Sequence, residues 1–565
     1  MTSKRPAHQL SDVEDDDDTT VKKSKLNDSV SSPINNDNRT IVTSPKPLTR
    51  INTADGSSIG TKPSCPYGVA CYRQNPQHFL EYSHPSTHSR LLTSSSSSTI
   101  QLKRYDPIDK IKHSLPYRFF LTTVKGIPDE NNALNALSLK EILSTQHGQL
   151  IQSAQFNYMF HIDWLIEQYP SEFRQKPLLI VHGCKRDELA SLKAECSPYP
   201  KIELCSADMP IPFGTHHTKM MFLLYTEGIR IVIHTSNLIP QDWNQKTQGI
   251  WISPIFPKIS KTTDDYSTTT ANSDSHTNFK RDLLTYLDRY SSKQLQFWMQ
   301  TILEHDMSSA NVHVISSVPG RFTGGDFQKF GHLKLRQVTI YCTLKTYLGI
   351  DKQEQYQSWP IVGQFSSIGS LGKDADQWLE KEFLTTLKQL NSSYLEKPEL
   401  KLIYPSVENV RTSLEGYKAG GSLPYSMNTA MRQPWLNKYL YQWHSDYRNR
   451  THASPHIKTY LRTSNDYKQL LWFLVTSANL SKAAWGSLEK DNTQLFIRSY
   501  EIGVLFLPKN FSCSSFPILD DKISDSFPIP YDLPPTKYEA KDKPWIVDIP
   551  YTSQRDSHDC TWNPH

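Results

Sequence analysis

The sequence lacks long hydrophobic runs. Its longest apolar stretches, 220–225 and 470–475, are only six residues long, whereas a membrane-spanning helix needs about 20. The first residues, Met-Thr-Ser-Lys-Arg-Pro, carry no apolar segment either. We therefore expect neither a membrane helix nor a secretory leader, and no association with membranes.

Cysteine is also scarce, and the chain has only a small excess of positive over negative charge. Of the 8 cysteines in 565 residues, only Cys65 and Cys71 lie close together. This spacing argues against a disulfide framework and favours a reducing compartment. The formal net charge of +5, diluted by the acidic run 14–18, is too small to establish a nucleic-acid partner by itself.

Residues 1–60 contain almost no aromatic side chains and are rich in Ser, Thr, Asp, Asn and Lys. Such a composition cannot bury enough apolar surface to offset the entropy lost on ordering, so we expect a disordered tail. Basic residues at 4–5 and 22–25 flank the acidic run. They fit a split nuclear import signal, and a solvated charged tail is the alternative.

From about Tyr117 the chain becomes dense in aromatic and aliphatic residues. Alternation of short β-branched runs with amphipathic segments favours an α/β architecture with mixed sheets covered by helices. The polar stretch 258–278 is typical of a mobile loop. The predicted strands are 178–181, 229–233, 338–341 and 470–475, and the predicted helices are 294–305 and 375–390.

Two thiols and two imidazoles lie within twenty residues of one another, at Cys65, Cys71, His78 and His84. This is the ligand set of a closed, tetrahedral structural zinc site. A segment this short has no core of its own, so bound metal would supply its folding energy. The sequence therefore predicts a zinc finger over residues 62–86.

The finger resembles the poly(ADP-ribose)-binding zinc finger of DNA-damage proteins, of the type found in aprataxin-and-PNK-like factor. The resemblance rests on Tyr-Gly after the first cysteine, Tyr-Arg after the second and the Tyr-x-His-Pro ending. It implies that Tyr67, Tyr72 and Arg73 hold the adenine and phosphate of an ADP-ribose unit, where stacking and a forked donor suit the ligand. A knuckle that only folds or binds protein is the alternative.

A half-site of one histidine, one lysine and one asparagine occurs twice in the chain. The first copy comprises His217, Lys219 and Asn237, and the second comprises His456, Lys458 and Asn479. Residues two apart in an extended strand share a face, so each histidine should project beside its lysine. Each asparagine follows an apolar run in a Thr-Ser-(Ala)-Asn-Leu segment, which should end the neighbouring strand.

Brought together, the two half-sites would form a phosphate-sized pocket. Two ammonium groups would neutralise the phosphate oxygens, and two histidines on opposite sides would allow in-line attack and protonation of the leaving group. One histidine must then be neutral and the other protonated, so their pKa values must differ. No acidic cluster for magnesium or zinc accompanies the motifs, and we expect catalysis without a cofactor.

The repeated motif resembles that of the phospholipase D superfamily. The Asp that most of that superfamily carries after the lysine is missing here, with Leu224 and Thr463 nearby instead. This departure resembles the tyrosyl-DNA phosphodiesterase branch, and the likeness covers about residues 116–553. The matching segments are 212–221 (Pro-Phe-Gly-Thr-His-His-Thr-Lys-Met-Met), 233–238, 245–251, 364–372, 455–460, 476–486 and 499–504.

The resemblance implies two phospholipase D-like domains, each a mixed sheet flanked by helices, related by pseudo-twofold symmetry and sharing one active site. It divides the chain into a tail (1–60), the finger (62–86), a flexible linker (87–115), an N-terminal domain (116–305), a C-terminal domain (306–553) and a C-terminal tail (554–565).

The resemblance also implies a reaction: removal of a topoisomerase I peptide from a DNA 3′ end, leaving a 3′-phosphate. His217 would be the nucleophile and form a phosphohistidine, and His456 would act as the general acid and then the general base. Lys219, Lys458, Asn237 and Asn479 would bind the phosphate. Gln248 and Glu501 would orient the histidines, and the sequence leaves open which serves which.

A set of further residues is implied to contact single-stranded or nicked DNA, with Phe213 stacking on a base. For Phe213 the alternative is core packing, and loop serines are often only solvated. Tyrosine and tryptophan also bury well for packing alone. The remaining members of the set are Ser366, Ser367, Ser370, Ser481, Tyr158, Arg432 and Trp545.

Taken together, the sequence predicts a nuclear, monomeric DNA-repair phosphodiesterase whose zinc finger binds poly(ADP-ribose). A superfamily relative acting on phospholipid should carry the ordinary Asp pattern and a membrane-binding element, and neither is seen. A non-catalytic poly(ADP-ribose) scaffold should carry a decayed half-site, whereas both copies are complete.

Overall fold

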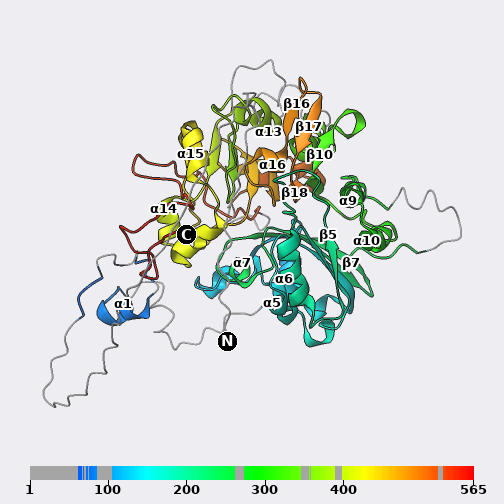
Figure 1. Cartoon of the computed structure of the whole chain (residues 1–565), viewed down its shortest axis with the longest axis horizontal. Coiled ribbons are helices and arrows are strands. Elements are labelled where there is room, and N and C mark those ends of the chain that lie inside the picture. Colours follow the sequence, from blue (N-terminus) through cyan, green and yellow to red (C-terminus); the bar gives the residue numbers. More distant parts are fainter. Residues whose placement is uncertain are drawn as a thin grey trace, which may run out of the picture.

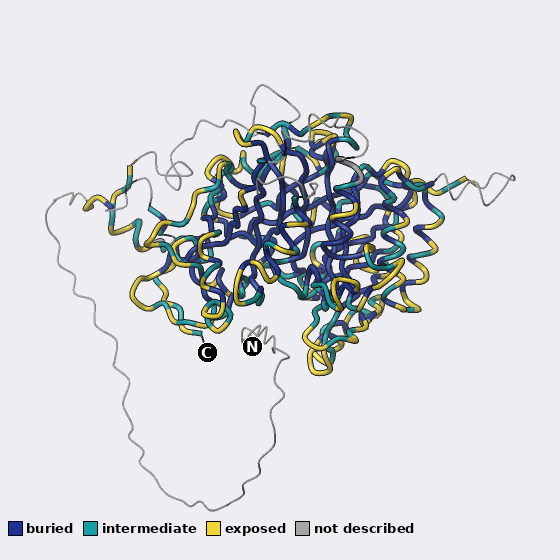
Figure 2. Tube along the Cα trace, turned by 90° about the horizontal axis from the view of Figure 1, so that it is seen from above, coloured by how far each residue is buried: buried dark blue, intermediate teal, exposed yellow. Residues whose placement is uncertain are grey.

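The computed structural model describes residues 62–65, 68, 71–73, 75–85, 105–260, 273–344, 356, 358–388, 398–518 and 526–564. Two large sheets and their helices form the body, and the finger lies at one end of it (Figure 1). Buried residues fill the centre of the body (Figure 2). The expected tail 1–60, most of the linker, and residues 261–272 of the polar stretch lie outside the described residues.

The first sheet has eight strands in the order β2-β1-β8-β7-β6-β3-β4-β5. Its strands are β1 (Phe119–Thr122), β2 (Ala136–Leu137), β3 (Leu150–Phe156), β4 (Leu178–His182), β5 (Ile202–Ser206), β6 (Met220–Tyr225), β7 (Gly228–His234) and β8 (Gly249–Ile252).

The second large sheet has the order β13-β12-β11-β14-β15-β18-β9, with β19 paired to β15, and a separate small sheet has the order β10-β17-β16. The strands are β9 (His313–Ser317), β10 (Gly320–Phe322), β11 (Ile361–Gln364), β12 (Leu400–Ile403), β13 (Leu440–Tyr441), β14 (Thr459–Thr463), β15 (Gln469–Thr476), β16 (Ser487–Glu489), β17 (Gln494–Ile497), β18 (Glu501–Phe506) and β19 (Phe516–Pro517).

The two large sheets share one topology. Reading β1-β8-β7-β6-β3-β4-β5 against β9-β18-β15-β14-β11-β12-β13 matches each strand with a counterpart. The first four pairings are antiparallel and the last two are parallel in both sheets. The duplication seen in the motifs thus extends to whole domains, and the expected mixed α/β architecture is confirmed.

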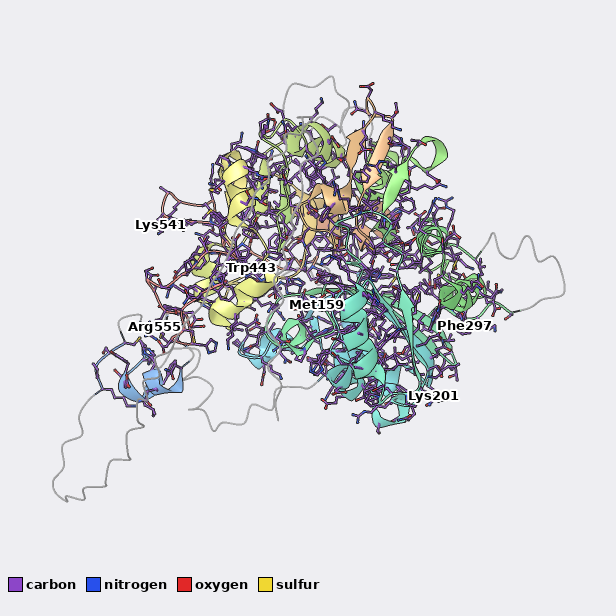
Figure 3. All side chains as sticks on the ribbon, viewed as in Figure 1. Met159, Lys201, Phe297, Trp443, Lys541 and Arg555 are labelled. Atoms are coloured by element: carbon purple, nitrogen blue, oxygen red, sulfur yellow. The ribbon has the colours of Figure 1, made fainter. Side chains whose placement is uncertain are left out.

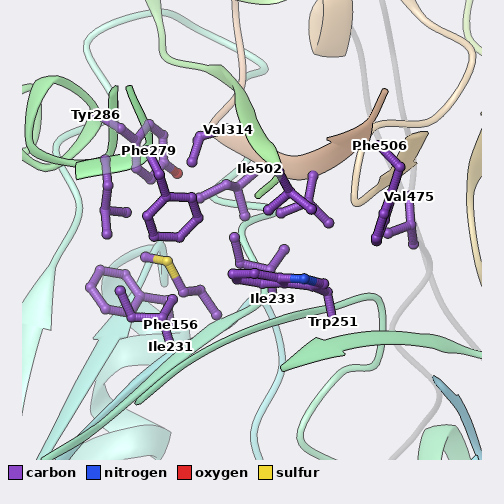
Figure 4. Packing of buried hydrophobic residues seen from close by; sticks show 14 of the residues in the cluster. Phe156, Ile231, Ile233, Trp251, Phe279, Tyr286, Val314, Val475, Ile502 and Phe506 are labelled. Atoms are coloured by element: carbon purple, nitrogen blue, oxygen red, sulfur yellow. The ribbon is translucent and has the colours of Figure 1, made fainter. Parts of the chain in front are cut away.

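The inner faces of the two sheets enclose a common core. Ile233 and Trp251 of the first sheet pack in one cluster with Val314 and Ile502 of the second (Figure 4). At Gly249 the halves approach so closely that a Cβ atom would lie 2.8 Å from Ile457 Cδ1. Because the outer faces also pack on helices, the central strands are apolar on both sides.

Helices cover the sheets. They are α3 (Pro107–His113), α4 (Leu139–Ile142), α5 (Ile162–Gln168), α6 (Arg186–Cys196), α7 (Pro240–Asn244), α9 (Phe279–Asp288), α10 (Lys293–Leu303), α11 (Gly331–Leu344), α13 (Thr385–Lys388), α14 (Val407–Arg411), α15 (Met427–Arg432) and α16 (Lys482–Trp485). One π-helical segment, η6 (Leu379–Leu384), precedes α13, and the 3₁₀ segments are η2 (Asp129–Asn132), η3 (Thr145–His147), η4 (Ser171–Phe173), η5 (Gly324–Asp326), η7 (Gly416–Ser422), η8 (Pro434–Tyr439) and η9 (Pro508–Phe511).

Most element predictions are confirmed, with one error. Strands β4, β7 and β15 and helix α10 lie where the apolar patterns placed them, and 375–390 is helical from Leu379 to Lys388. The predicted strand 338–341 is wrong, because it lies inside helix α11. A four-residue run rich in β-branched residues fits a buried helix face as well as a strand, and here Leu335 and Val338 pack into the second domain's core.

The ends of the described chain pack on the second domain. The finger contains helix α1 (Pro76–Glu81) and closes on itself through a bridge between Ser64 and Ser83. The C-terminal segment 554–564 is fixed to the body, with Asp556 and Ser557 buried. Within the described residues, no helix has the length and apolarity needed to cross a membrane.

Candidate active site and zinc finger

Each His-x-Lys copy lies immediately before the central strand of its sheet. His217 and Lys219 precede β6, and His456 and Lys458 precede β14, so the motifs lead into the strands rather than belong to them. Strands β6 and β14 occupy the same place in the two sheets. The shared topology therefore sets the two histidines in equivalent positions.

Backbone hydrogen bonds lock each histidine to the opposite domain. The His217 N–H donates to the Tyr500 carbonyl at 3.0 Å, and the His456 N–H donates to the Thr247 carbonyl at 3.0 Å. Tyr500 and Thr247 each directly precede the residue that orients a histidine. The contacts are the same on both sides, so they extend the pseudo-twofold relation to the centre of the site.

The side-chain partners also cross between the domains. Nδ1 of His217 lies 2.9 Å from a carboxylate oxygen of Glu501. Nδ1 of His456 lies 3.0 Å from Nε2 and 3.3 Å from Oε1 of Gln248. The structure thus pairs Glu501 with His217 and Gln248 with His456, which the sequence left open.

A hydroxyl group fixes each orienting side chain. The Thr235 hydroxyl accepts the Gly249 N–H at 2.9 Å and donates to Oε1 of Gln248 at 2.7 Å. In the other domain, the Ser477 hydroxyl accepts the Ile502 N–H and donates to Glu501. Thr235 is therefore the counterpart of Ser477 rather than of Thr476, and the extra Ala478 of the second motif accounts for the one-residue offset.

These hydrogen bonds place the ring proton on different nitrogen atoms in the two histidines. The ionised Glu501 only accepts, so His217 carries its proton on Nδ1 and keeps a lone pair on Nε2. Because the Gln248 oxygen is taken by Thr235, its amide N–H faces Nδ1 of His456, and the proton of that neutral ring lies on Nε2. The two imidazoles therefore offer opposite chemistry at Nε2.

The lysines and asparagines complete the two half-sites. Nζ of Lys219 donates to the carbonyl of His217 at 3.1 Å, and Nζ of Lys458 donates to that of His456 at 2.5 Å. Both lysine side chains are fully buried. The Asn479 oxygen accepts the N–H groups of Ser366 and Ser367, whereas the buried Asn237 oxygen has no partner among the described residues.

Burial and the clustered cations depress the basicity of the site. Burial, with the charges of Lys458 and Lys219, holds the pKa of His456 well below its ordinary value. The pKa of His217 is also lowered by burial, although the charge of Glu501 opposes the shift. Burial lowers the pKa of Lys219 to about 8, against the charges of Glu501 and Asp242. Both imidazoles are therefore neutral at neutral pH before an anion binds.

The carboxylate of Glu501 stays ionised despite its burial. Burial alone would raise its pKa, but the charge that His217 carries when it is protonated and the hydrogen bond of that ring, followed by the Ser477 hydroxyl and Lys219, bring the pKa of Glu501 below its ordinary value. An ionised Glu501 is the state that the proton assignment on His217 requires.

Asp242, on α7, is a site residue that the sequence reasoning missed. Its Oδ2 accepts the Asn237 N–H at 2.7 Å and lies 3.4 Å from Nδ1 of His456. The side chain is buried. The only signal in the sequence is its place between Asn237 and Gln248, and since the second half-site has no counterpart, comparing the copies could not reveal it.

Two of the expected DNA-contacting residues lie where a substrate could meet them. The Tyr158 ring stands 5.8 Å from the His217 ring, edge to face, and 6.0 Å from Nζ of Lys219. Phe213 is 56% exposed, which excludes core packing in this structure. Its φ of 62° is left-handed, and Gly214 beside it packs so tightly that a Cβ would lie 2.1 Å from the Arg498 carbonyl oxygen.

The other expected DNA contacts differ in position. Ser366 and Ser367 are buried beneath Asn479, and the Ser481 hydroxyl accepts the Ala484 N–H at the start of α16. Ser370 is half-buried and Arg432, at the end of α15, is exposed. The expectation that Trp545 contacts DNA is wrong. Its side chain is fully buried, donates to the Gly420 carbonyl and stacks on Tyr551, so it presents no surface to a substrate.

The four expected zinc ligands converge. The donor atoms of Cys65, Cys71, His78 and His84 all lie within 4.8 Å of one another. Nε2 of His78 stands 3.4 Å from the Cys65 sulfur and 3.3 Å from the Cys71 sulfur. Two sulfurs and two imidazole nitrogens at such separations fit the first shell of a tetrahedral zinc ion.

Of the residues expected to bind ADP-ribose, Tyr72 and Arg73 face the catalytic body. The Tyr72 hydroxyl accepts a hydrogen bond from Arg411 at 2.6 Å, and Arg73 forms an ion pair with Asp559. Tyr67 lies outside the described residues.

Comparison with known proteins places both parts of the chain. A family model described as tyrosyl-DNA phosphodiesterase matches residues 118–539, and one described as a PBZ domain matches residues 62–87. The chain is 39% identical to tyrosyl-DNA phosphodiesterase 1 of Drosophila melanogaster, over 78% of this chain and 75% of the relative. It is 34% identical to the Arabidopsis thaliana protein of the same name, over 82% and 78%.

The fold also matches a solved structure. The crystal structure of the yeast tyrosyl-DNA phosphodiesterase superposes with a TM-score of 0.56 and 21% identity, covering 76% of this chain and 99% of that chain. At this identity the match supports the fold alone.

Proposed function

The chain belongs to the tyrosyl-DNA phosphodiesterase family, and we propose that it hydrolyses the 3′-phosphotyrosyl bond between DNA and a topoisomerase I peptide through a phosphohistidine. Family membership makes it a DNA-repair phosphodiesterase carrying a PBZ zinc finger. The finer proposal concerns the bond, the intermediate and the residues. Other 3′ adducts that place a phosphodiester between the half-sites would be accepted by the same chemistry.

The opposite polarity of the two Nδ1 partners is the observation that carries the proposal. Glu501 accepts from His217 and so leaves the Nε2 lone pair of that ring free to attack phosphorus. Gln248 donates to His456 and so puts a proton on its Nε2, on the side of the leaving group. The pair is a nucleophile and a proton donor, with His217 and His456 in those roles.

In the first step, Nε2 of His217 forms a bond to phosphorus while the bond from phosphorus to the tyrosine oxygen breaks. His456, protonated in the complex with the anionic substrate, gives its Nε2 proton to that oxygen. In the second step His456 takes a proton from water, which attacks phosphorus as the N–P bond breaks. The products are the tyrosyl peptide, a 3′-phosphate and regenerated His217.

The remaining site residues stabilise the phosphoryl group. Lys219 and Lys458 neutralise its oxygens, and the side-chain amides of Asn237 and Asn479 orient it. Substrate charge also readies the acid: a bound phosphodiester offsets the two lysines that depress the pKa of His456, so the ring gains its proton when substrate arrives. Exposed Phe213 stacks on a DNA base in this proposal.

Asp242 is proposed as a positioning residue for the protonated state of His456. Once Nδ1 carries a proton, Gln248 can no longer donate to it, and the carboxylate 3.4 Å away becomes its acceptor. Catalysis requires protonated His456, so the rate falls as pH rises through the pKa of this ring. Removing the negative charge lowers that pKa further, which moves the falling limb to lower pH.

We therefore predict that Asp242→Asn reduces kcat at neutral pH by on the order of tenfold, the effect of one pKa unit, and that activity recovers at lower pH. The asparagine oxygen still accepts the Asn237 N–H, so local structure is kept. Measurement of kcat against pH checks this. An unshifted alkaline limb would leave Asp242 with a structural role only.

The finger supports recruitment to damaged DNA. Its match to the PBZ domain and its converging ligands support a structural zinc ion and poly(ADP-ribose) binding. Because this polymer marks broken DNA, a finger that binds it raises the local concentration of the phosphodiesterase at lesions. A nuclear location and a single-chain, monomeric enzyme complete the proposal.

Metal removal separates the two functions and tests the proposed reaction. We predict that in excess EDTA the chain still cleaves a 3′-phosphotyrosyl oligonucleotide, with a rate within about twofold of the untreated rate, because the site uses no metal. Poly(ADP-ribose) binding should fall by at least about tenfold, since the finger loses its folding energy without zinc. The Cys71→Ala variant should reproduce this separation without a chelator. A strict divalent-metal requirement for cleavage would refute the mechanism.

A further inference from the structure

The zinc finger lies against the second domain with its expected ligand-binding residues inward. Tyr72 is 7% exposed, and its ring is covered by the guanidinium of Arg411, 4.5 Å from the ring centroid. Arg411 is held in this position by two hydrogen bonds to Glu408, and it also donates to the Arg555 carbonyl. The Tyr72 face is therefore occupied by the body.

Arg73 is engaged by the C-terminal segment. Its guanidinium forms an ion pair with Asp559 and donates to the Asp556 carbonyl at 3.2 Å. The other carboxylate oxygen of Asp559 accepts from Asn75, the N-cap of α1, at 2.8 Å. One carboxylate thus binds two donors of the finger. Figure 1 shows the finger beside the C-terminal segment, and Figure 3 labels Arg555 next to the finger.

The segment that presents Asp559 is itself fixed to the domain. Buried Asp556 accepts the Tyr417 N–H from the body and the N–H groups of His558 and Cys560 within the turn. Ser557 N–H donates to the Arg411 carbonyl. Asp559 sits at φ 62°, a left-handed conformation that aspartate tolerates. The turn 555–560 and Arg411 together form one preorganised surface, here called the finger dock.

The finger dock and an ADP-ribose unit would contact Tyr72 and Arg73 through similar chemical groups. A carboxylate and a phosphate both accept the planar fork of an arginine, and a guanidinium covers an aromatic ring as a purine does. An ADP-ribose unit that used Tyr72 and Arg73 would have to displace Arg411 and Asp559. Its phosphates would also meet the negative charge of Asp559.

We infer that the finger dock is an intramolecular competitor for the ADP-ribose-binding face of the finger, so that docking and polymer binding exclude each other. This rests on the proposed function of the finger. Poly(ADP-ribose) binding then detaches the finger from the catalytic body, and the free protein keeps the face covered until polymer is abundant. None of the proposed active-site residues belongs to the finger or to the finger dock.

Competition within one chain is effective even when each contact is weak. Residues 86–104 connect the described finger to the described body, and a short tether gives an effective concentration on the order of millimolar. The apparent affinity for polymer is the intrinsic affinity multiplied by the undocked fraction. A finger docked for about nine-tenths of the time would therefore bind polymer about tenfold more tightly once the dock is removed.

Asp559→Gly in the full chain tests this. Glycine keeps the left-handed turn and removes the carboxylate. We expect the dissociation constant for purified poly(ADP-ribose) to fall by about three- to tenfold, with an unchanged rate on a 3′-phosphotyrosyl oligonucleotide. Glu539→Ala, which removes an exposed carboxylate of the same C-terminal region, is the matched control and should leave polymer affinity unchanged. Equal affinity of Asp559→Gly and the unaltered chain would overturn the competition.

A distance measurement reports docking without relying on polymer. Spin labels attached by a non-cysteine chemistry at Gln77 and Lys418, both exposed, should give a narrow distance distribution in the unaltered chain. The distribution should broaden in Asp559→Gly and after polymer is added to the unaltered chain. A narrow distribution that persists at saturating polymer would refute exclusion. If neither the unaltered chain nor any variant binds polymer, the proposed ligand of the finger and the proposed competition are both wrong. A broader distance distribution in Asp559→Gly would then still show that Asp559 holds the finger on the dock.

Discussion

His456→Ala should convert the enzyme into a covalent trap for its own substrate. Loss of the acid slows departure of the tyrosine in the first step, but a phenol has a pKa of about 10 and can leave as the phenolate without a proton donor. In the second step the attacking water has a pKa of about 16 and needs a base to activate it. General acid–base catalysis contributes about 10² to 10⁴ to a step. We expect the larger loss on the second step, so that the phosphohistidine at His217 accumulates.

The trapped species is measured directly. After incubation with a labelled 3′-phosphotyrosyl oligonucleotide, a denaturing gel should show DNA attached to His456→Ala and little free 3′-phosphate. His217→Ala should give neither adduct nor product, because the nucleophile is missing. An adduct on His217→Ala, or complete turnover by His456→Ala, would reverse or refute the assigned roles.

Glu501→Gln should remove the nucleophilic lone pair at Nε2 of His217 although His217 itself is unchanged. An amide at this position can donate its N–H to Nδ1 of His217 while its oxygen takes the hydroxyl of Ser477. The ring would then carry its proton on Nε2 and present no lone pair to phosphorus. In the serine-protease triad, the same carboxylate-to-amide exchange costs about 10⁴ in kcat through the wrong tautomer. We expect a loss of about 10³ to 10⁴ here.

The counterpart change, Gln248→Glu, provides the comparison. A carboxylate at Nδ1 of His456 favours the protonated ring, which is the form needed to donate in the first step. We expect a loss well below that of Glu501→Gln and a shift of the alkaline limb of kcat to higher pH. Single-turnover rates across pH for both variants check this. A Glu501→Gln enzyme within about threefold of the unaltered rate would show that tautomer control does not govern attack.

Much of the molecule follows from local sequence patterns. The strands β4, β7 and β15 could be predicted from their own residues, because segments dense in aliphatic, β-branched and aromatic side chains suit strands buried on both faces. The zinc ligands are close in sequence, so their convergence was predictable. The repeat of the half-site predicted a duplicated domain, which the matching strand orders confirm.

Local patterns were insufficient where neighbours from another element decide the outcome. The run 338–341 is helical because its environment is the helix-covered face of the second domain. Trp545 was expected in the groove, but Tyr417 and Tyr551 stack on it and bury it. Burial of a large aromatic side chain depends on what packs against it, and the composition of its own segment does not reveal this.

By itself, the sequence determined which residue types the two half-sites contain: two histidines, two lysines and two amides in paired motifs. Only the tertiary structure decided how they divide the work. Glu501 and His217 are 284 positions apart, and Gln248 and His456 are 208 apart. The partners belong to opposite domains, so their pairing exists only once the two sheets pack together. In the proposed reaction, the polarity of those two hydrogen bonds makes one imidazole the nucleophile and the other the acid.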